Sequence, residues 1–180
     1  MTILLFGISN VGKSITGELL AKQLGYHFYD LDEEVKKRQH TTIEKFVTTE
    51  LLEDRDYIRG CIIGDIFDED PENKIIAVTP ISFYDNFEEY LEYPEVLAIE
   101  LRDTPENIFK RLVFSDENDV VYFDDDYKNA NAEHYLTEIA RDLEWYGQCN
   151  ERVTNKFDMN GDTPEEVVSR LINEYDLKKK

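Results

Sequence analysis

Residues 7 to 14 read Gly-Ile-Ser-Asn-Val-Gly-Lys-Ser, which is the pattern G-x-x-x-x-G-K-S. This spacing suits the phosphates of a nucleotide, because two glycines let the chain turn until successive backbone N–H groups face one anion. Lys13 can reach the β- and γ-phosphates, and the hydroxyl of Ser14 can bind Mg²⁺. The sequence therefore predicts an ATP–Mg²⁺ site built from Gly7, Ser9, Asn10, Val11, Gly12, Lys13, Ser14 and Ile15.

The segments on either side of this loop agree with that interpretation. Residues 2–6 form a short apolar run that is typical of a buried strand, and residues 15–24 carry an apolar stripe at helical spacing. A strand, a glycine loop and a helix in this order aim the helix N-terminus at a phosphate. The alternative, a chance match in a glycine-containing turn, does not account for these flanks.

A second group of candidate residues is Asp30-Leu31-Asp32, which follows a short strand expected at 26–29. At the carboxyl end of that strand, two carboxylates would lie beside the phosphate-binding loop. We expect Asp30 to bind Mg²⁺ through water, and Asp32 to hold or deprotonate the hydroxyl of an acceptor molecule. Either aspartate could instead serve as the N-cap of a following helix.

Apolar and helical segments alternate along the whole chain. Strands are expected at 2–6, 26–29, 74–79, 95–101 and 153–159, and helices at 15–24, at 33–68 in two or three pieces, after Thr104, at 131–150 and after Thr163. This order predicts one α/β domain over 1–180, with a five-stranded parallel sheet and helices on both of its faces. Ligands of such sheets bind at the carboxyl ends of the strands.

The region 115–130 contains six acidic residues before Tyr127 and no basic residue among 115–127. It falls between two expected helices, which favours a lid over the site, although a mobile acidic surface loop is an equal alternative.

The 180-residue chain has a net charge of −20, which argues against a nucleic-acid partner and is most simply explained by solubility. No stretch of 18 apolar residues is present, so no membrane-spanning helix is expected. The first strand begins too early to leave room for a signal peptide, and Cys61 and Cys149 lack metal-ligand spacing. These features fit a cytoplasmic protein.

The run from Gly7 to Asp32 resembles the beginning of a shikimate kinase. It combines the phosphate-binding loop, a helix that ends in Ala-x-x-Leu-Gly, and Phe-x-Asp-x-Asp. This resemblance implies a kinase that transfers phosphate from ATP to a small hydroxylated acceptor. More weakly, it implies that Arg55 and Arg141 bind an acidic acceptor, that Arg111 lies beside the adenine, and that 158–166 forms the adenine loop and the start of the last helix.

The chain also departs from that family. Thr79-Pro80-Ile81 stands where the family has three glycines, Ile58 stands in place of a glutamate, and the expected lid contains no arginine. Arg55 and Arg141 lie in acidic runs, so surface ion pairs are an alternative role for both. Two alternatives to a shikimate kinase therefore stay open, namely a kinase for a nucleotide or sugar and a nucleotide-binding protein without phosphotransfer. The acceptor and the oligomeric state are not determined by the sequence.

Overall fold

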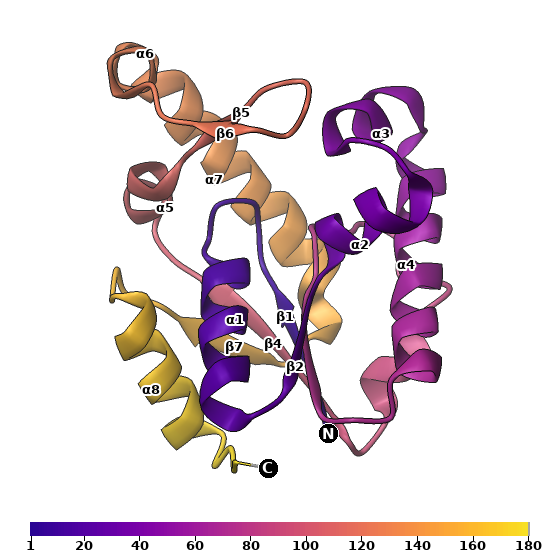
Figure 1. Cartoon of the computed structure of the whole chain (residues 1–180). Coiled ribbons are helices and arrows are strands. Elements are labelled where there is room, and N and C mark those ends of the chain that lie inside the picture. The colour runs from indigo at the N-terminus through magenta and orange to yellow at the C-terminus, as the bar shows by residue number, and fades with distance from the viewer. Residues whose placement is uncertain (180) are drawn as a thin grey trace.

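The structure is a computed structural model that describes residues 1–179. Its main sheet has five parallel strands in the order β2-β3-β1-β4-β7, as Figure 1 shows. The central strand pairs with both neighbours in register, because Leu4 lies opposite Ile76 on one side and Ala98 on the other. The predicted five-stranded parallel sheet is therefore confirmed, with strands β1 (Thr2–Phe6), β2 (His27–Asp30), β3 (Lys74–Ala77), β4 (Val96–Arg102) and β7 (Asn155–Asp158).

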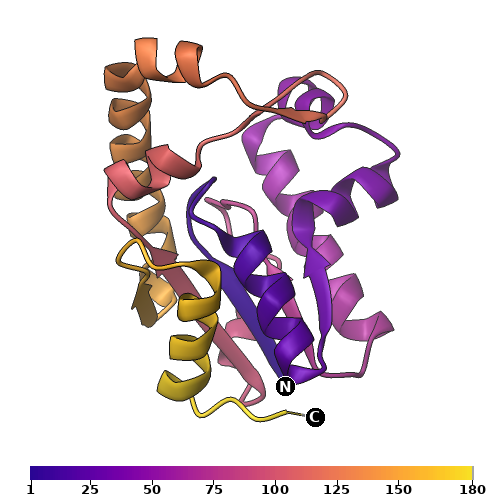
Figure 2. The same cartoon turned by 60° about the vertical axis from the view of Figure 1, so that its left-hand side comes forward.

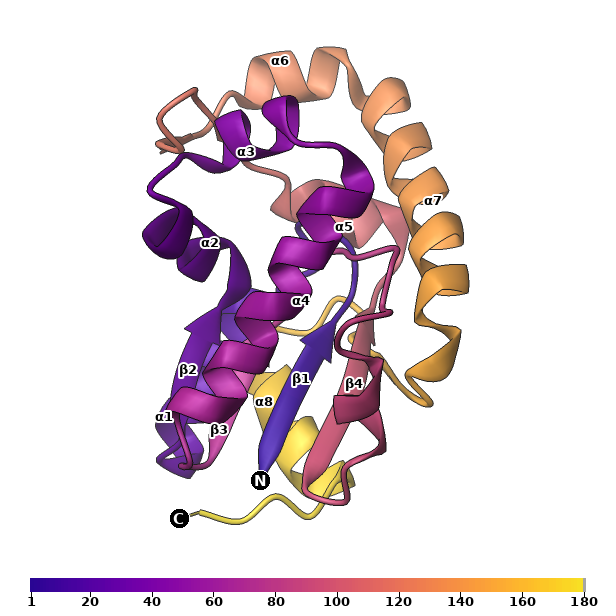
Figure 3. The ribbon, with the colours of Figure 1, turned by 90° about the vertical axis from the view of Figure 1, so that its right-hand side faces the viewer.

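Helices cover both faces of this sheet. Side chains alternate along a strand, so Ile3 and Leu5 of β1 enter one core while Leu4 and Phe6 enter the other. Helices α1 (Lys13–Leu24) and α8 (Pro164–Glu174) cover the first face. The opposite face is covered by α4 (Leu52–Glu69), and α7 (Ala132–Cys149) runs beside β4, as Figure 3 shows.

The helical region expected at 33–68 consists of three helices, α2 (Leu31–Gln39), α3 (Ile43–Thr49) and α4. Side chains cap the first two, because Asp30 accepts from the backbone N–H groups at the start of α2 and Thr42 accepts from Lys45. His40, with φ of 51°, ends α2 in a left-handed turn. These breaks turn the chain so that α3 lies above α4 in Figure 3.

The capping signals in the C-terminal half are confirmed. Thr104 caps α5 (Pro105–Arg111), and Thr163 forms a reciprocal capping box with Glu166 at the start of α8. Two short 3₁₀ helices, η1 (Glu88–Glu92) and η2 (Asn150–Arg152), precede β4 and β7.

The acidic region 115–130 contains structure that the sequence did not predict. A hairpin of β5 (Phe114–Ser115) and β6 (Val121–Tyr122) is followed by helix α6 (Asp125–Ala130). The hairpin extends across the top of the molecule toward α3 (Figure 2). Asp119 at its turn accepts hydrogen bonds from the backbone N–H groups of Ile43 (2.7 Å) and Glu44 (3.3 Å). The hairpin is thus attached to the start of α3.

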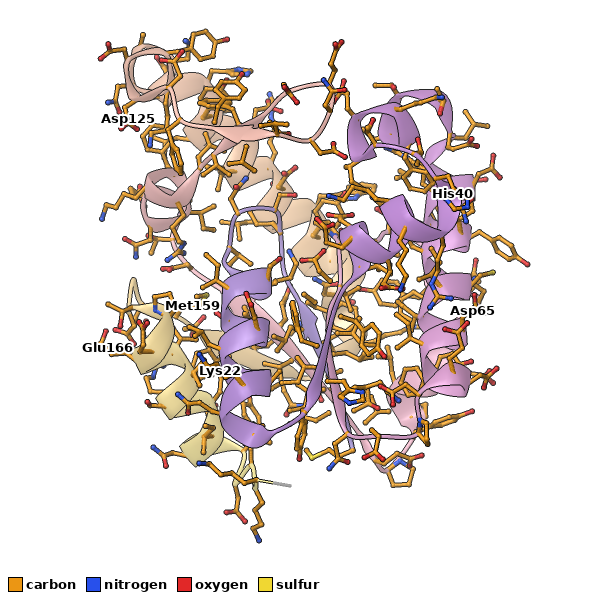
Figure 4. The ribbon with its side chains drawn as sticks, viewed as in Figure 1. Lys22, His40, Asp65, Asp125, Met159 and Glu166 are labelled. Carbon is orange, nitrogen blue, oxygen red and sulfur yellow. The ribbon has the colours of Figure 1, made fainter. Side chains whose placement is uncertain are left out.

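The negative charge is spread over the surface. In Figure 4, Asp65 on α4 lies at the right of the molecule, whereas Asp125 on α6 and Glu166 on α8 lie at the upper and lower left. Among residues 1–179, no helix is both long enough and apolar enough to cross a membrane.

Candidate active site

The phosphate-binding loop joins β1 to α1 at the carboxyl end of the sheet (Figure 1). Gly7 has φ of 135°, and a Cβ there would lie 2.6 Å from the backbone oxygen of Leu101. Gly12 has φ of 113° and precedes α1, which has no side-chain cap. The first backbone N–H groups of α1 therefore remain available to an anion.

Lys13 lies folded across this loop. Its Nζ donates to the backbone oxygens of Gly7 and Ile8, both at 2.8 Å, and its side chain is buried. Burial lowers the pKa of Lys13 to about 8, although the charges of Asp32 and Asp30 act in the opposite direction. The ammonium group has no carboxylate within ion-pair distance among the described residues, so it is available to a phosphate.

Asp30 connects the loop to α2. Its Oδ2 accepts a short hydrogen bond from the hydroxyl of Ser14, while its Oδ1 accepts from the backbone N–H groups of Asp32 (3.0 Å) and Glu33 (3.3 Å). The alternative role considered from the sequence, a helix N-cap, is therefore present, and the second oxygen of Asp30 meets Ser14. Binding of Mg²⁺ by Asp30 stays a prediction.

This pair of oxygens fits a magnesium ion. Mg²⁺ in nucleotide sites commonly takes one or two protein oxygens and completes its shell with phosphates and water. The hydroxyl of Ser14 and the carboxylate of Asp30 are hard oxygen donors that already touch, at the end of the helix that faces the phosphates. The residues present therefore fit the metal that the loop pattern implies.

Asp32 lies in the first turn of α2, beside the loop. Burial raises its pKa, and this effect is opposed by a hydrogen bond with Thr79 and by the charge of Arg59. The Nη2 of Arg59 is 3.8 Å from Oδ1 of Asp32, and this oxygen is buried with no hydrogen-bond partner among the described residues. The Asp32 side chain is 41% exposed although Oδ1 is buried, so the rest of the carboxyl group is open to the cavity. A carboxylate with a raised pKa in that position can accept a proton from an alcohol.

Two adjoining cavities meet at Asp32. The first, which we call the loop cavity, has a volume of about 310 Å³ and lies between the phosphate-binding loop, the end of β3 and the β5–β6 hairpin. The second, the α4–α7 cavity, has a volume of about 210 Å³. Four residues line both cavities, namely Ser9, Asp32, Thr79 and Pro80.

Arg55 lines the α4–α7 cavity from α4. Its Nη1 donates to the backbone oxygen of Val47 at 3.1 Å, and its Nε is buried without a partner. The other seven of the eight arginines each lie within 4.0 Å of a carboxylate in residues 1–179, and Arg55 does not. The surface ion pair considered for Arg55 is therefore not formed within the described chain.

Arg141 is in a different position from the one that the resemblance implied. Its guanidinium is exposed, its Nη1 is 2.9 Å from Glu138, and it is absent from the lining of the α4–α7 cavity. The side chains that α7 presents to this cavity are those of Asp142 and Tyr146. A helix has 3.6 residues per turn, so consecutive side chains point about 100° apart. Asp142 therefore lines the cavity, whereas Arg141, the residue that the resemblance implied, does not.

Arg111 and the expected adenine segment lie on the other side of the loop. Arg111 donates to the buried carboxylate of Asp103 at 2.5 Å, and its role beside adenine stays a prediction. From that segment, Asp158 and Asn160 line a cavity of about 440 Å³ together with Gly7 and Ile8 of the loop. This cavity therefore borders both the phosphate-binding loop and the segment predicted to hold the base.

The comparisons with known proteins agree with this geometry. The family model for shikimate kinase matches residues 9–176. The chain belongs to the shikimate kinase family. No curated protein sequence matches it significantly. The shikimate kinase of Bacteroides thetaiotaomicron is similar in structure, with a TM-score of 0.79, 22% sequence identity, and 98% of this chain and 99% of that chain covered.

Two further solved structures are also similar. The shikimate kinase of Acinetobacter baumannii in complex with shikimate has a TM-score of 0.69 and 20% identity, with 98% of this chain and 95% of that chain covered. A gluconokinase from Sinorhizobium meliloti has a TM-score of 0.59 and 15% identity, with coverage of 97% and 94%. At these identities the likeness establishes the P-loop kinase fold, and the acceptor has to be argued from the site.

Sequence reasoning missed two residues of this site, Arg59 and Asp142. Arg59 is 5% exposed, donates to the fully buried Asp56 at 3.3 Å and lies over the ring of Phe46. Its spacing from Arg55 by four residues places both arginines on one face of α4, and this signal was available in the sequence. No local pattern distinguished Asp142 from the acidic residues around it.

Proposed function

We propose that this protein is an ATP-dependent phosphotransferase that moves the γ-phosphoryl group of ATP to a hydroxyl group of a small polar acceptor. The observation that carries the proposal is the meeting of the two cavities at Asp32, with the phosphate-binding loop in one and a free arginine in the other. This arrangement gives separate places to the nucleotide and the acceptor on either side of one carboxylate.

The chain's own residues account for the parts that phosphoryl transfer needs. The backbone N–H groups of the loop and the ammonium of Lys13 hold the β- and γ-phosphates. Ser14 and Asp30 would hold Mg²⁺, which when bound neutralises charge on the phosphates. Asp32 accepts the hydroxyl proton as the acceptor oxygen bonds to the γ-phosphorus, and the bond from that phosphorus to the bridging oxygen breaks to release ADP.

Shikimate is the first acceptor to test, because its hydroxyl groups suit Asp32 and its carboxylate suits Arg55. A charge-assisted contact of a guanidinium with a carboxylate is among the stronger polar contacts in proteins. A sugar or sugar acid is a second candidate acceptor, and its only support is that this chain shares its fold with the gluconokinase.

A nucleotide-binding protein without phosphotransfer is the alternative from a different class. One observation favours it, because among residues 1–179 Lys13 is the one basic residue that lines the loop cavity, and the β5–β6 hairpin adds none. In P-loop GTPases an additional arginine stabilises the transition state and is worth roughly 10³–10⁵ in rate.

The test is release of ADP in a coupled assay with shikimate and with gluconate, in the wild type, Lys13→Ala and Asp32→Asn. We expect acceptor-dependent turnover that is abolished in Lys13→Ala, together with weaker nucleotide binding. Asp32→Asn should bind ATP normally and lose at least a hundredfold in kcat, since an amide cannot accept the proton. Tight ATP binding without acceptor-dependent turnover on any hydroxylated compound would favour the binding protein.

A further inference from the structure

The α4–α7 cavity contains an unusual arrangement of charges. Arg59 is held by two carboxylates, those of Asp56 and Asp32, and so brings little free positive charge to the cavity. Arg55 has no carboxylate partner among the described residues and faces the same cavity. The cavity therefore offers one uncompensated cation on its α4 side.

The α7 side of the same cavity offers an uncompensated anion. The carboxylate of Asp142 has neither a hydrogen bond nor an ion pair among residues 1–179, and Arg141 next to it is paired with Glu138 instead. Asp142 is an exposed residue at the edge of this cavity, and desolvation by its surroundings together with the nearby Glu138 raises its pKa. A cation bound beside Asp142 would oppose both effects, because it stabilises the charged form of the carboxylate.

Arg55 and Asp142 do not satisfy each other. No nitrogen–oxygen pair within 4.0 Å joins them, although both line a cavity of only about 210 Å³. Helices α4 and α7 stand on two sides of the strand ends in Figure 3, so the two charges come from separate walls. An acceptor lying between them would meet a guanidinium on one side, a carboxylate on the other, and Asp32 near the loop.

We propose that the acceptor is a small hydroxyl-bearing zwitterion, such as a hydroxy amino acid, and that Asp142 selects it by binding its ammonium group. The inference rests on the proposed phosphotransfer and names the class of its substrate. The acceptor's carboxylate binds Arg55, its ammonium donates to Asp142, and its hydroxyl oxygen lies at Asp32. Three contacts from three elements fix the orientation of the molecule, as specific sites require.

The size of the cavity agrees with this class. Its volume is below the roughly 300–1,000 Å³ of pockets for drug-sized ligands, so the acceptor is small. A molecule with a carboxylate and no amine would satisfy Arg55 but leave Asp142 unpaired, and it would bring a third carboxylate beside Asp32 and Asp142. Shikimate is such a molecule, so the zwitterion is expected to be the better acceptor.

The test compares acceptors that differ only in the ammonium group. L-Homoserine is paired with γ-hydroxybutyrate, and L-serine with β-hydroxypropionate, and shikimate is included as a carboxylate without an amine. The value of kcat/KM is measured from ADP release in the wild type, in Asp142→Asn, and in Glu144→Gln as a control on an exposed residue of α7 outside the cavity lining. Thermal unfolding of all three proteins checks that they are equally folded.

In the wild type, the ammonium-bearing member of at least one pair should be preferred at least tenfold. Asp142→Asn should raise KM for that member about tenfold or more and lower it for the partner without the amine, while kcat changes little and Glu144→Gln behaves like the wild type. A merely structural role for Asp142 would move both members of a pair alike.

Several outcomes would overturn the inference. They are equal or better turnover of the compounds without an amine, a preference that Asp142→Asn leaves unchanged, and neither turnover nor binding of homoserine and serine in protein loaded with an ATP analogue. Turnover of shikimate alone would refute the zwitterion and leave the phosphotransferase intact. The proposed function fails by a separate route, through ATP binding without turnover on any hydroxylated compound.

Discussion

Removing the carboxylate of Asp56 is expected to destabilise the protein more than any neighbouring change on α4. Asp56 is fully buried, and it receives the guanidinium of Arg59 at 3.3 Å and the backbone N–H groups of Ser82 at 2.8 Å and Phe83 at 3.2 Å. These contacts join α4 to the two residues that follow Ile81, close to Pro80, which lines both cavities. Asp56→Ala would leave a buried guanidinium and two backbone donors without their acceptor.

The size of the effect follows from these contacts. Breaking a buried ion pair by removing one partner costs about 3–5 kcal/mol, because the remaining charge stays buried. Arg59 retains Asp32 at 3.8 Å, a longer contact, so the lower end of the range is the better figure. In a chain of this size, about 3 kcal/mol corresponds to a fall of roughly 6–12 °C in Tm.

The assay is urea unfolding followed by circular dichroism, with Asp56→Ala compared with Asp68→Ala. Asp68 is an exposed residue of the same helix, so its removal should change the free energy of unfolding by less than about 0.5 kcal/mol. A second comparison uses Arg59→Ala and the double variant. The double variant should be more stable than the sum of the single losses predicts, because the two residues contact each other. A loss below about 1 kcal/mol in Asp56→Ala would refute the reasoning.

Two further predictions concern the nucleotide and the hairpin. Because the pKa of Lys13 is lowered to about 8, its positive charge is present below that pH, so nucleotide affinity should fall as pH rises through about 8. Titration of ADP at pH 7 and 9 measures this fall. A Lys13→Arg variant stays charged and should show a smaller fall; an equal fall would mean that Lys13 is not its cause. Asp119→Asn keeps a residue type that tolerates φ of 60° but removes the charge that binds the start of α3, so amide exchange at 115–122 should quicken several-fold. Glu117→Gln is the matched control for that exchange experiment, and equal protection in both variants would mean that Asp119 does not hold the hairpin.

The sheet and its order of elements were predictable because their signals are local. Apolar runs, Pro105 and Pro164 at helix starts, and the capping threonines before them each act over a few residues. The loop from Gly7 to Ser14 was predictable for the same reason, since its glycines meet a backbone requirement that only glycine fulfils easily.

The acceptor side of the site was less predictable because it is assembled from distant segments. Arg55, Asp142 and Thr79 come from α4, α7 and the end of β3, and no local pattern records that they share one cavity. The resemblance directed attention to Arg141, but helical rotation turns its neighbour toward the cavity instead. The hairpin at 114–122 was also missed, since its two-residue strands are too short to show a period.

In a chain with a net charge of −20, a cation that lacks a carboxylate partner identifies the site better than the residue type alone does. In a chain with twice as many acidic as basic residues, a guanidinium meets a carboxylate almost everywhere, as it does for seven of the eight arginines. A cation that is largely shielded from water and still lacks a carboxylate is therefore informative, because desolvation without compensation costs free energy. Lys13 and Arg55 meet this criterion, and they lie on the two sides of Asp32, where the proposed reaction needs a positive charge for the phosphates and another for the acceptor.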